Sequence, residues 1–176
     1  MPRIDPLSPS AASPSVRGAW EQHLLENPGS RITNMKATLS HSPLAFGVYM
    51  EWYPLYREVV GIVGERLAYL FAHAISEGSN CPLCTTFFRK IIIQNGERPE
   101  DLVLTEAEQE LLDFGAEFAQ NQGEISDETY QKIAARYSRE QVVVLVAFAG
   151  QMVATNLFNN ALRVEIDGYL TPYLPL

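Results

Sequence analysis

Helix start signals in the second half of the chain constrain the fold most strongly. Thr105 is followed three residues later by Glu108, and this spacing forms a capping box ahead of an apolar helical period. Ser138 and Gln141 repeat the pattern before a long apolar segment. Nowhere do two alternating apolar runs flank a turn signal, as a β-hairpin would require. The sequence therefore predicts an all-α protein.

Further start and stop signals divide the rest of the chain into helices. Ser42 followed by Pro43 predicts a helix start, and Pro54 predicts a kink or break within that helix. Gly78 is expected to end the next helix as a left-handed C-cap. The valine run 142–146 has strand propensity, but the helical period that continues beyond it favours one buried helix. We expect helices over residues 44–59, 64–76, 81–94, 126–137 and 142–164, and another between the capping box at residue 105 and the glycine at 123.

Four prolines, at positions 2, 6, 9 and 14, distinguish residues 1–16 from the rest of the chain. This segment has no apolar period, so we expect an N-terminal arm that becomes ordered against a partner subunit. Residues 17–176 are long enough for one domain with a full core, and no signal divides them. The prediction is a Pro- and Ser-rich arm followed by a single helical domain.

The charge balance argues against some classes of partner. With 13 Lys and Arg against 21 Asp and Glu, the formal net charge is −8, which disfavours binding to nucleic acid or to an anionic membrane. No apolar stretch approaches the length needed to span a bilayer, and residues 1–6 lack the apolar region of a signal peptide. We therefore expect a cytoplasmic protein that binds neither nucleic acid nor membrane, and whose cysteines are kept reduced.

Both cysteines of the chain lie in one motif, Cys81-Pro82-Leu83-Cys84, just after a predicted helix end. Thiols at this spacing can close a small disulfide ring, and a helix N-terminus stabilises a thiolate over a thiol. With no other cysteine to form a structural framework, the pair either cycles between dithiol and disulfide, binds something, or is packed core. Glu77, four residues before Cys81, and the helix-cap context favour redox chemistry.

The surroundings of this motif carry a resemblance to a known family. A helix ends in Ser76-Glu77, a short break contains Asn80, and Cys81-x-x-Cys84 opens the next helix. This arrangement resembles the carboxymuconolactone decarboxylase and alkylhydroperoxidase D-like (AhpD-like) superfamily. The resemblance implies an AhpD-like helical bundle that assembles as a homo-oligomer, and a dithiol branch that reduces peroxides.

A second, less specific part of the resemblance lies near the C-terminus. An asparagine-rich face (Asn156, Asn159 and Asn160) is followed by an aliphatic, acidic and glycine end over residues 164–168, which is similar to the family's final helix. By order of helices, the resemblance covers roughly residues 30–170.

Carried onto this sequence, the resemblance makes Cys84 the thiol that attacks the peroxide, Cys81 the resolving thiol and Glu77 a proton acceptor. The family pattern has a histidine four residues after the second cysteine, where this chain has Phe88. A general base normally contributes about 10²–10⁴-fold, so we expect a weak thiol-dependent peroxidase or disulfide reductase. His73 shares a helix face with Glu77 at i, i+4 and is the other candidate for the relay. The expected partners are a hydroperoxide and a thiol or dithiol donor, and no cofactor is expected.

Less specific interpretations remain beside this one. A cysteine pair is often core, a buried histidine is more often a satisfied core residue than a relay member, and Glu77 could be a solvated charge. A zinc site would need two further ligands from His23, His41 or His73, and none is paired at ligand spacing. A lactone decarboxylase would need no dithiol, whereas a non-catalytic oligomeric or ligand-binding protein would explain the missing histidine. The aromatic residues Trp52, Tyr53, Tyr56, Phe87 and Phe88 are interpreted as core or subunit interface, or together as the lining of an apolar pocket by the thiols.

Overall fold

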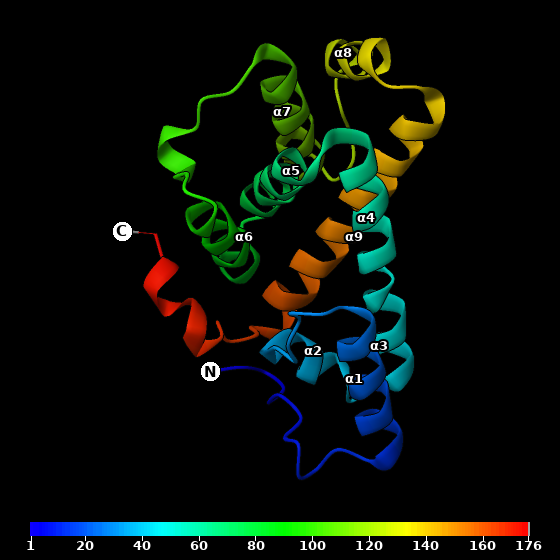
Figure 1. The fold of residues 1–176 in the computed structure, drawn as a ribbon, viewed down its shortest axis with the longest axis vertical. Coiled ribbons are helices and arrows are strands. Elements are labelled where there is room, and N and C mark those ends of the chain that lie inside the picture. The colour runs from blue at the N-terminus through cyan, green and yellow to red at the C-terminus, as the bar shows by residue number, and fades with distance from the viewer. Residues whose placement is uncertain (176) are drawn as a thin grey trace.

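The computed structural model describes residues 1–175, and this part of the chain is helical without any strand (Figure 1). The predicted all-α class is confirmed. In chain order the elements are α1 (Pro14–Glu26), α2 (Asn34–Leu39), α3 (Pro43–Met50), α4 (Trp52–Val63), α5 (Glu65–Gly78), α6 (Pro82–Gln94), the 3-10 turn η1 (Pro99–Asp101), α7 (Glu106–Gln120), α8 (Asp127–Arg136), α9 (Arg139–Leu162) and the 3-10 helix η2 (Gly168–Tyr173).

Helix α5 runs through the centre of the molecule, packed against α4, α6, α7 and α9 (Figure 1). Ten of its fourteen residues are buried, because apolar side chains occupy nearly its whole circumference. The Phe71 ring stacks on Phe114 of α7 and meets Phe148 of α9, each at a centroid distance of 5.9 Å. Such aromatic contacts bury large apolar areas with defined geometry. They fix α5, and with it the turn that carries the cysteine motif.

A second, smaller core joins α1, α2 and α3 at the lower end of the molecule in Figure 1. Trp20, Leu39 and Phe46 are its largest buried residues. The Trp20 indole N–H donates to Ser40 Oγ at 2.7 Å, so the polar atom of this buried ring is satisfied. This small core positions α2 against the cysteine region.

The two capping boxes form as the sequence predicts. In each, the N-cap side chain accepts the N3 backbone N–H, and the N3 side chain accepts the N-cap N–H. The predicted role of Gly78 is wrong, because Gly78 is still helical and Asn80 takes the left-handed conformation (φ 49°). A Cβ at Gly78 would lie 2.8 Å from the Ala116 carbonyl oxygen, so the glycine allows α5 to approach α7 closely.

The break predicted at Pro54 lies one turn earlier. Glu51 is both the last cap of α3 and the first cap of α4, and Pro54 follows in the first turn of α4. A proline there costs no hydrogen bond, because the N–H groups of a first helical turn have no intrahelical partner. The valine run lies within α9 and is helical, as predicted.

Helix α9 is longer and more uniformly apolar than the sequence argument allowed. Its 24 residues include an 18-residue window with a mean hydropathy of 1.7, enough to cross a bilayer by length and composition alone. In this fold α9 packs against α4, α5, α7 and α8, and Leu145, Phe148, Ala149 and Met152 lie in the core. These core contacts account for part of its apolar composition, because 33% of the apolar window is buried.

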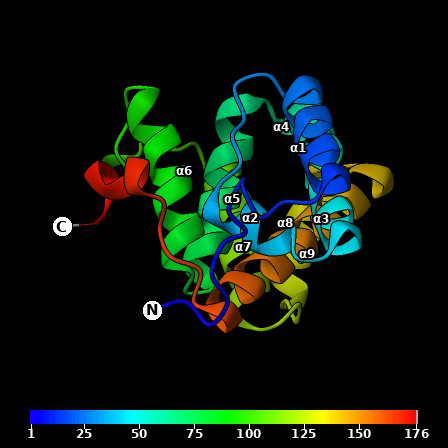
Figure 2. The same cartoon turned by 90° about the horizontal axis from the view of Figure 1, so that it is seen from below.

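The N-terminal segment packs against its own chain, whereas the sequence suggested a partner subunit. The Arg3 backbone N–H bonds to the Leu162 carbonyl at 2.9 Å, and the Leu7 N–H to the Ala37 carbonyl at 3.3 Å. Figure 2 shows this segment passing beneath the end of α9, while the C-terminal segment crosses to α6. Helix α1 begins at Pro14, inside the region expected to be an arm. The N-terminal segment therefore covers the end of α9, and η2 covers α6.

Candidate functional site: a dithiol beside an aromatic pocket

The cysteine motif lies at the start of α6 because the turn after α5 is sharp. Asn80 is left-handed, and the Cys81 backbone N–H bonds back to the Ser76 carbonyl at 3.1 Å. Cys81 is then the N-cap of α6, and Pro82 occupies the first turn. Both thiols are free and buried, with 1% of Cys81 and 5% of Cys84 exposed.

The two sulfurs are electrostatically unequal. A hydrogen bond from the Cys84 thiol, together with the backbone N–H groups of Cys84 and Leu83, lowers the pKa of Cys81 from 9.0 to about 7 despite burial. The same contact with Cys81, and burial, raise the pKa of Cys84 well above its ordinary value. Asn159 of α9 donates from Nδ2 to Cys84 Sγ at 3.2 Å. Above about pH 7 the pair therefore holds one proton on Cys84 and a thiolate on Cys81.

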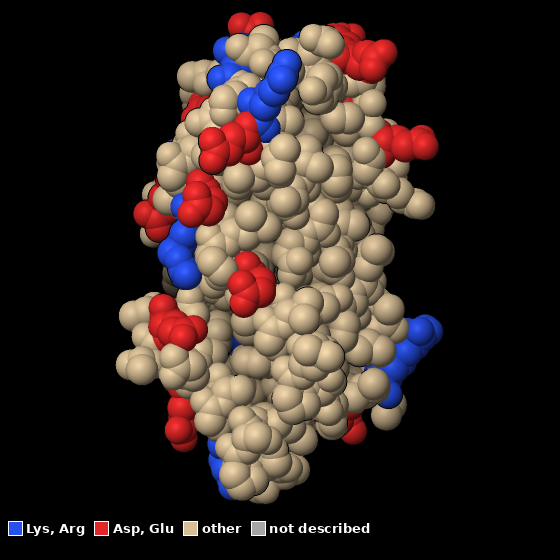
Figure 3. Space-filling model, turned by 90° about the vertical axis from the view of Figure 1, so that its right-hand side faces the viewer, with Lys and Arg blue, Asp and Glu red and all other residues tan. Residues whose placement is uncertain are grey.

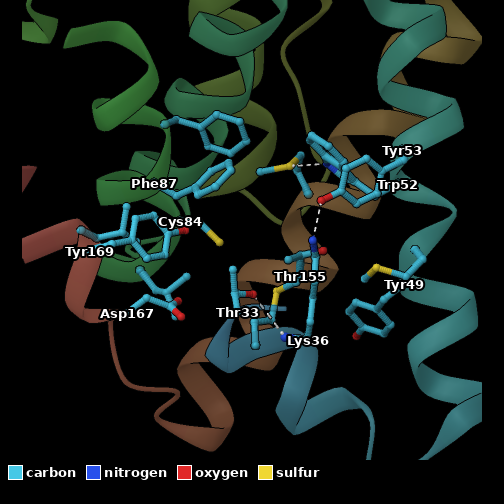
Figure 4. A pocket seen from close by; sticks show the side chains of 16 residues that line it. Thr33, Lys36, Tyr49, Trp52, Tyr53, Cys84, Phe87, Thr155, Asp167 and Tyr169 are labelled. Atoms are coloured by element: carbon cyan, nitrogen blue, oxygen red, sulfur yellow. Dashed lines mark hydrogen bonds between the residues drawn. The ribbon is translucent and has the colours of Figure 1, made fainter. Parts of the chain in front are cut away.

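Cys84 opens onto a pocket formed where α2, α3, α4, α6, α9 and η2 meet (Figure 4). The pocket volume of about 90 Å³ is several times the roughly 10–15 Å³ that one water needs. Most of the wall is aromatic or aliphatic, which suits a small apolar ligand. The lining residues are Thr33, Met35, Lys36, Tyr49, Met50, Trp52, Tyr53, Leu83, Cys84, Phe87, Phe88, Met152, Thr155, Asp167, Tyr169 and Leu170.

Four of the five aromatic residues singled out in the sequence line this pocket, and Trp52, Tyr56, Phe87 and Phe88 also belong to or pack against the main core. Phe88 is on the same face of α6 as Cys84, one helical turn further on. Trp52 stacks on Tyr56 at 4.6 Å and donates its indole N–H to Met152 Sδ at 2.9 Å. Tyr56 lies behind Trp52 and supports it without lining the pocket.

A buried lysine forms the opposite wall of the pocket (Figure 4). Lys36 is 4% exposed, and burial lowers its pKa to about 8. Burial, and then the nearby Lys36 charge, lower the pKa of His23 to about 4, so this imidazole is neutral and can accept. Lys36 Nζ contacts Ser30 Oγ (2.6 Å), Tyr53 Oη (2.7 Å), His23 Nε2 (2.9 Å) and the Arg31 carbonyl (3.0 Å).

Cys81 faces a different hollow from Cys84. This hollow has a volume of about 420 Å³, is open to solvent, and includes Asn160 and Arg163 from the end of α9. Arg163 caps α9 in the left-handed conformation (φ 51°). The disulfide ring that the two cysteines can form would therefore separate an aromatic pocket from a more polar, open hollow.

The structure brings His73 and Glu77 together, but away from the thiol pocket. His73 Nδ1 is 3.4 Å from Glu77 Oε2 on α5, and both line a third hollow that lies against η1 and α7. Burial, and then the charge of Arg89, lower the pKa of His73 to about 4, while burial raises the pKa of Glu77. Arg89 pairs with Glu100 and so is also engaged on that side of α6. Neither His73 nor Glu77 lines the pocket onto which Cys84 opens.

Several polar residues of the thiol site were not recognised in the sequence. Lys36, Asp167 and Tyr169 come from segments more than forty residues away from the cysteine motif in one direction or the other. Asp167 was noted only as part of an acidic end of the final helix, and Lys36 stands in an ordinary mixed segment. No spacing in the sequence links these residues to Cys84, so only the fold brings them together.

Comparisons with solved structures support the fold along almost the whole chain. The debrominase Bmp8 superposes with a TM-score of 0.76 at 18% identity, covering 97% of this chain and 95% of that one. A cysteine-to-alanine variant of Bmp8 in complex with 2,3,4-tribromopyrrole gives a TM-score of 0.75 at 20% identity, covering 97% and 94%. An uncharacterised peroxidase-related protein from Silicibacter sp. TM1040 gives 0.65 at 14% identity, covering 96% and 91%. By sequence, the chain matches no protein-family model and no curated protein.

These neighbours have the fold of the carboxymuconolactone decarboxylase and AhpD-like proteins. The fold resemblance inferred from the cysteine motif and the order of helices is therefore confirmed. At these identities the comparison establishes the fold, and the chemistry has to be argued from the site.

Proposed function

We propose that this protein is a dithiol oxidoreductase that reduces a small hydroperoxide while Cys81 and Cys84 become a disulfide. One observation carries the proposal: two free cysteines share the first turn of α6, and one of them opens onto an aromatic pocket. A buried thiol pair with unequal pKa values is typical of redox-active dithiols. Its fold neighbours include a peroxidase-related protein and a debrominase.

In the proposed reaction Cys84 Sγ attacks the distal oxygen of the hydroperoxide and the O–O bond breaks. The Cys84 proton passes to the Cys81 thiolate through the hydrogen bond that joins the two sulfurs. The alkoxide takes up a proton from solvent and leaves as an alcohol, and Cys84 becomes a sulfenic acid. Cys81 then releases its proton to solvent and attacks Cys84, forming the S–S bond, and hydroxide leaves and is protonated to water.

The Cys81 thiolate would act as the base in the first step, where the family pattern has a histidine and this chain has Phe88. A thiolate with a pKa of about 7 is a weaker base than the Cys84 thiolate it must generate, so proton transfer is uphill. The expected turnover is therefore slow.

A halogenated aromatic is the second candidate substrate class. The pocket wall is rich in aromatic rings, among them Trp52, Phe87 and Tyr169, and a flat ring would pack well against them. The similarity of the fold to that of a debrominase, over 97% of this chain, supports a halogenated aromatic as a candidate substrate. In such a reaction a carbon–halogen bond is replaced by carbon–hydrogen, the dithiol is oxidised to a disulfide, and halide is released with a proton.

Either reaction needs an external thiol or dithiol to reduce the disulfide again. Cys81 borders the open hollow, which offers the reductant a route that does not pass through the aromatic pocket. We place the protein in a reducing compartment such as the cytoplasm, where both cysteines stay free between turnovers.

Steady-state turnover tests the proposal. The purified protein is supplied with dithiothreitol and either cumene hydroperoxide or 2,3,4-tribromopyrrole, and peroxide loss or bromide release is followed. The proposal expects turnover of one of the two, abolished in both Cys84→Ser and Cys81→Ser. Turnover that survives in both variants, or its absence with both substrates in the wild type, would contradict it.

A further inference from the structure

One carboxylate in the pocket wall has an oxygen that the protein leaves without a partner. Asp167 is 9% exposed, and its Oδ1 accepts the backbone N–H of Asn34 at 2.9 Å. Its Oδ2 is buried and has no hydrogen-bond partner within residues 1–175. A buried unsatisfied acceptor is costly, and a carboxylate oxygen more so than a neutral one.

Asp167 lines the pocket of Cys84. Asp167 lies beside Tyr169 on the same side of the pocket as Cys84, while Lys36 and Tyr53 lie across from them (Figure 4). The hydrogen bond to Asn34 at the start of α2 holds the carboxylate in place in the pocket wall. A molecule bound in this pocket can therefore contact both Asp167 and Cys84.

The other polar side chains deep in the wall are already engaged. Lys36 has four hydrogen-bond contacts for its three N–H bonds, Thr155 donates to the Gln151 carbonyl, and Trp52 donates to Met152. None of these donors is directed to Asp167 Oδ2. No side chain of residues 1–175 donates to this oxygen in the structure, so a ligand that carries a donor can supply the missing hydrogen bond.

We propose that Asp167 is a specificity-determining residue, which accepts a hydrogen bond from an N–H or O–H group of the substrate and so orients the reactive atom toward Cys84. This inference rests on the proposed function, because it concerns the same pocket, and it narrows the substrate class. A hydroperoxide meets the requirement through its O–H, and an aromatic substrate must carry a ring N–H or a phenolic O–H. An ether or an N-alkylated ring lacks the donor and leaves the carboxylate unsatisfied.

The acceptor role of Asp167 requires the ionised form of its carboxyl group. Burial raises its pKa, whereas the Asn34 N–H and the positive charges of Arg31 and Lys36 oppose that rise. An ionised carboxylate has only acceptor sites, so a donor on the ligand is the matching group. Hydrogen bonds to charged groups are the stronger ones in proteins.

Calorimetric titration of the reduced protein with 4-methylphenol and with 4-methylanisole tests the inference. The two probes differ by one O-methyl group, and neither can oxidise the dithiol. From the strength of a hydrogen bond to a charged group, wild type should bind the phenol about tenfold to a hundredfold more tightly. Equal affinities, whether measurable or too weak to detect, would overturn the inference without the need for any variant.

Asp167→Asn separates hydrogen bonding from the extra bulk of the anisole. In this variant the amide oxygen must still face the Asn34 N–H, so the amide NH₂ replaces Oδ2 in the pocket and donates where the carboxylate accepted. The preference for the phenol should disappear or reverse, whereas a preference caused by bulk would persist and refute the inference. Asp101→Asn, at an exposed position, changes the net charge equally and should leave the preference intact. If Asp167→Asn does not fold, Asp167→Ser, whose hydroxyl can accept the same N–H, takes its place.

The binding test is independent of the redox test. Absence of the probe preference in the wild type, together with normal turnover, would refute the role of Asp167 alone. A clear preference in a protein that turns over neither substrate would refute the proposed function alone.

Discussion

The Cys81 thiolate depends on its neighbour more than on the helix alone. The hydrogen bond from the Cys84 thiol is the largest of the effects that lower the Cys81 pKa, ahead of the backbone N–H groups of the first turn. A buried sulfur without such donors would instead have a raised pKa. The two cysteines therefore act as one titrating unit.

Cys84→Ala should raise the pKa of Cys81 from about 7 toward its ordinary value of 9.0. The substitution removes the thiol donor but keeps the backbone N–H groups, so we expect the midpoint to stay below 9.0. In wild type the thiolate is lost as the pH falls through about 7, and in the variant it is lost at higher pH. Ultraviolet absorbance of the thiolate against pH measures both midpoints. An unchanged midpoint would show that the helix N-terminus alone sets this pKa.

Phe88→His should accelerate hydroperoxide reduction. Phe88 is 3% exposed and borders the pocket one turn beyond Cys84, so an imidazole there can take the Cys84 proton. We expect a gain of roughly tenfold or more, smaller than the usual general-base effect of about 10²–10⁴-fold because burial of the ring disfavours its charged form. Phe88→Leu is the control for the altered pocket size. A similar rate in both variants would mean that proton transfer from Cys84 does not limit turnover.

At the residue scale, the sequence identified the cysteine pair but only part of its surroundings. Two cysteines at a helix start have a local signature, and four of the aromatic residues that line the pocket were named with them. The placement of Lys36 and Asp167 has no local signature, because each approaches Cys84 only through the packing of distant segments. His73 and Glu77 satisfy helical spacing to each other, but that spacing says nothing about whether their face of α5 meets the thiols.

At the element scale, the capping boxes predicted helix starts correctly, whereas close contacts between helices could not be predicted. Capping boxes are made within one helical turn, so both are legible in the sequence and both form. Gly78 is a glycine because α5 and α7 approach each other closely there, and not because a helix ends there. Pro54 lies in the first turn of α4 because the break between α3 and α4 falls at Glu51. A glycine that allows two helices to approach and a glycine that ends a helix look alike in a sequence.

Gly78→Ala should destabilise the fold by about 1–3 kcal/mol, the usual cost of overpacking. The new methyl group would lie 2.8 Å from the Ala116 carbonyl oxygen and 3.0 Å from Ala119 Cβ, so α5 and α7 must separate. Gly61→Ala is the matched control on α4, where a Cβ meets nothing within 4 Å and should stabilise the helix by roughly 0.5–1 kcal/mol. Urea unfolding of both variants gives the two values. Equal effects of the same sign would contradict the close-contact role of Gly78.

At the scale of the whole molecule, one face carries little charge. Figure 3 shows the side formed around α3 and α4, where the middle of the surface is almost free of Lys, Arg, Asp and Glu. Exposed apolar residues on α3 and α9 include Leu44 (78%), Val48 (55%), Val143 (67%) and Leu157 (57%). Surface of this kind commonly belongs to an interface.

We therefore expect a homo-oligomer, with exposed apolar side chains of α3 and α9 contributing to the contact. Sedimentation equilibrium at micromolar concentration should give at least twice the chain mass of 19.7 kDa. Val143→Glu should weaken the assembly, whereas Val103→Glu, on an exposed loop before α7, should not. A single species of one chain mass would contradict this expectation.

Mass analysis after oxidation is the most direct test of whether Cys81 and Cys84 form a redox pair. The reduced protein is treated with one equivalent of cumene hydroperoxide, and peptides are mapped without reduction. The account predicts an intramolecular Cys81–Cys84 disulfide in wild type and a trappable sulfenic acid on Cys84 in Cys81→Ser. Two free thiols in wild type after this treatment, with no sulfenic acid in the variant, would contradict it.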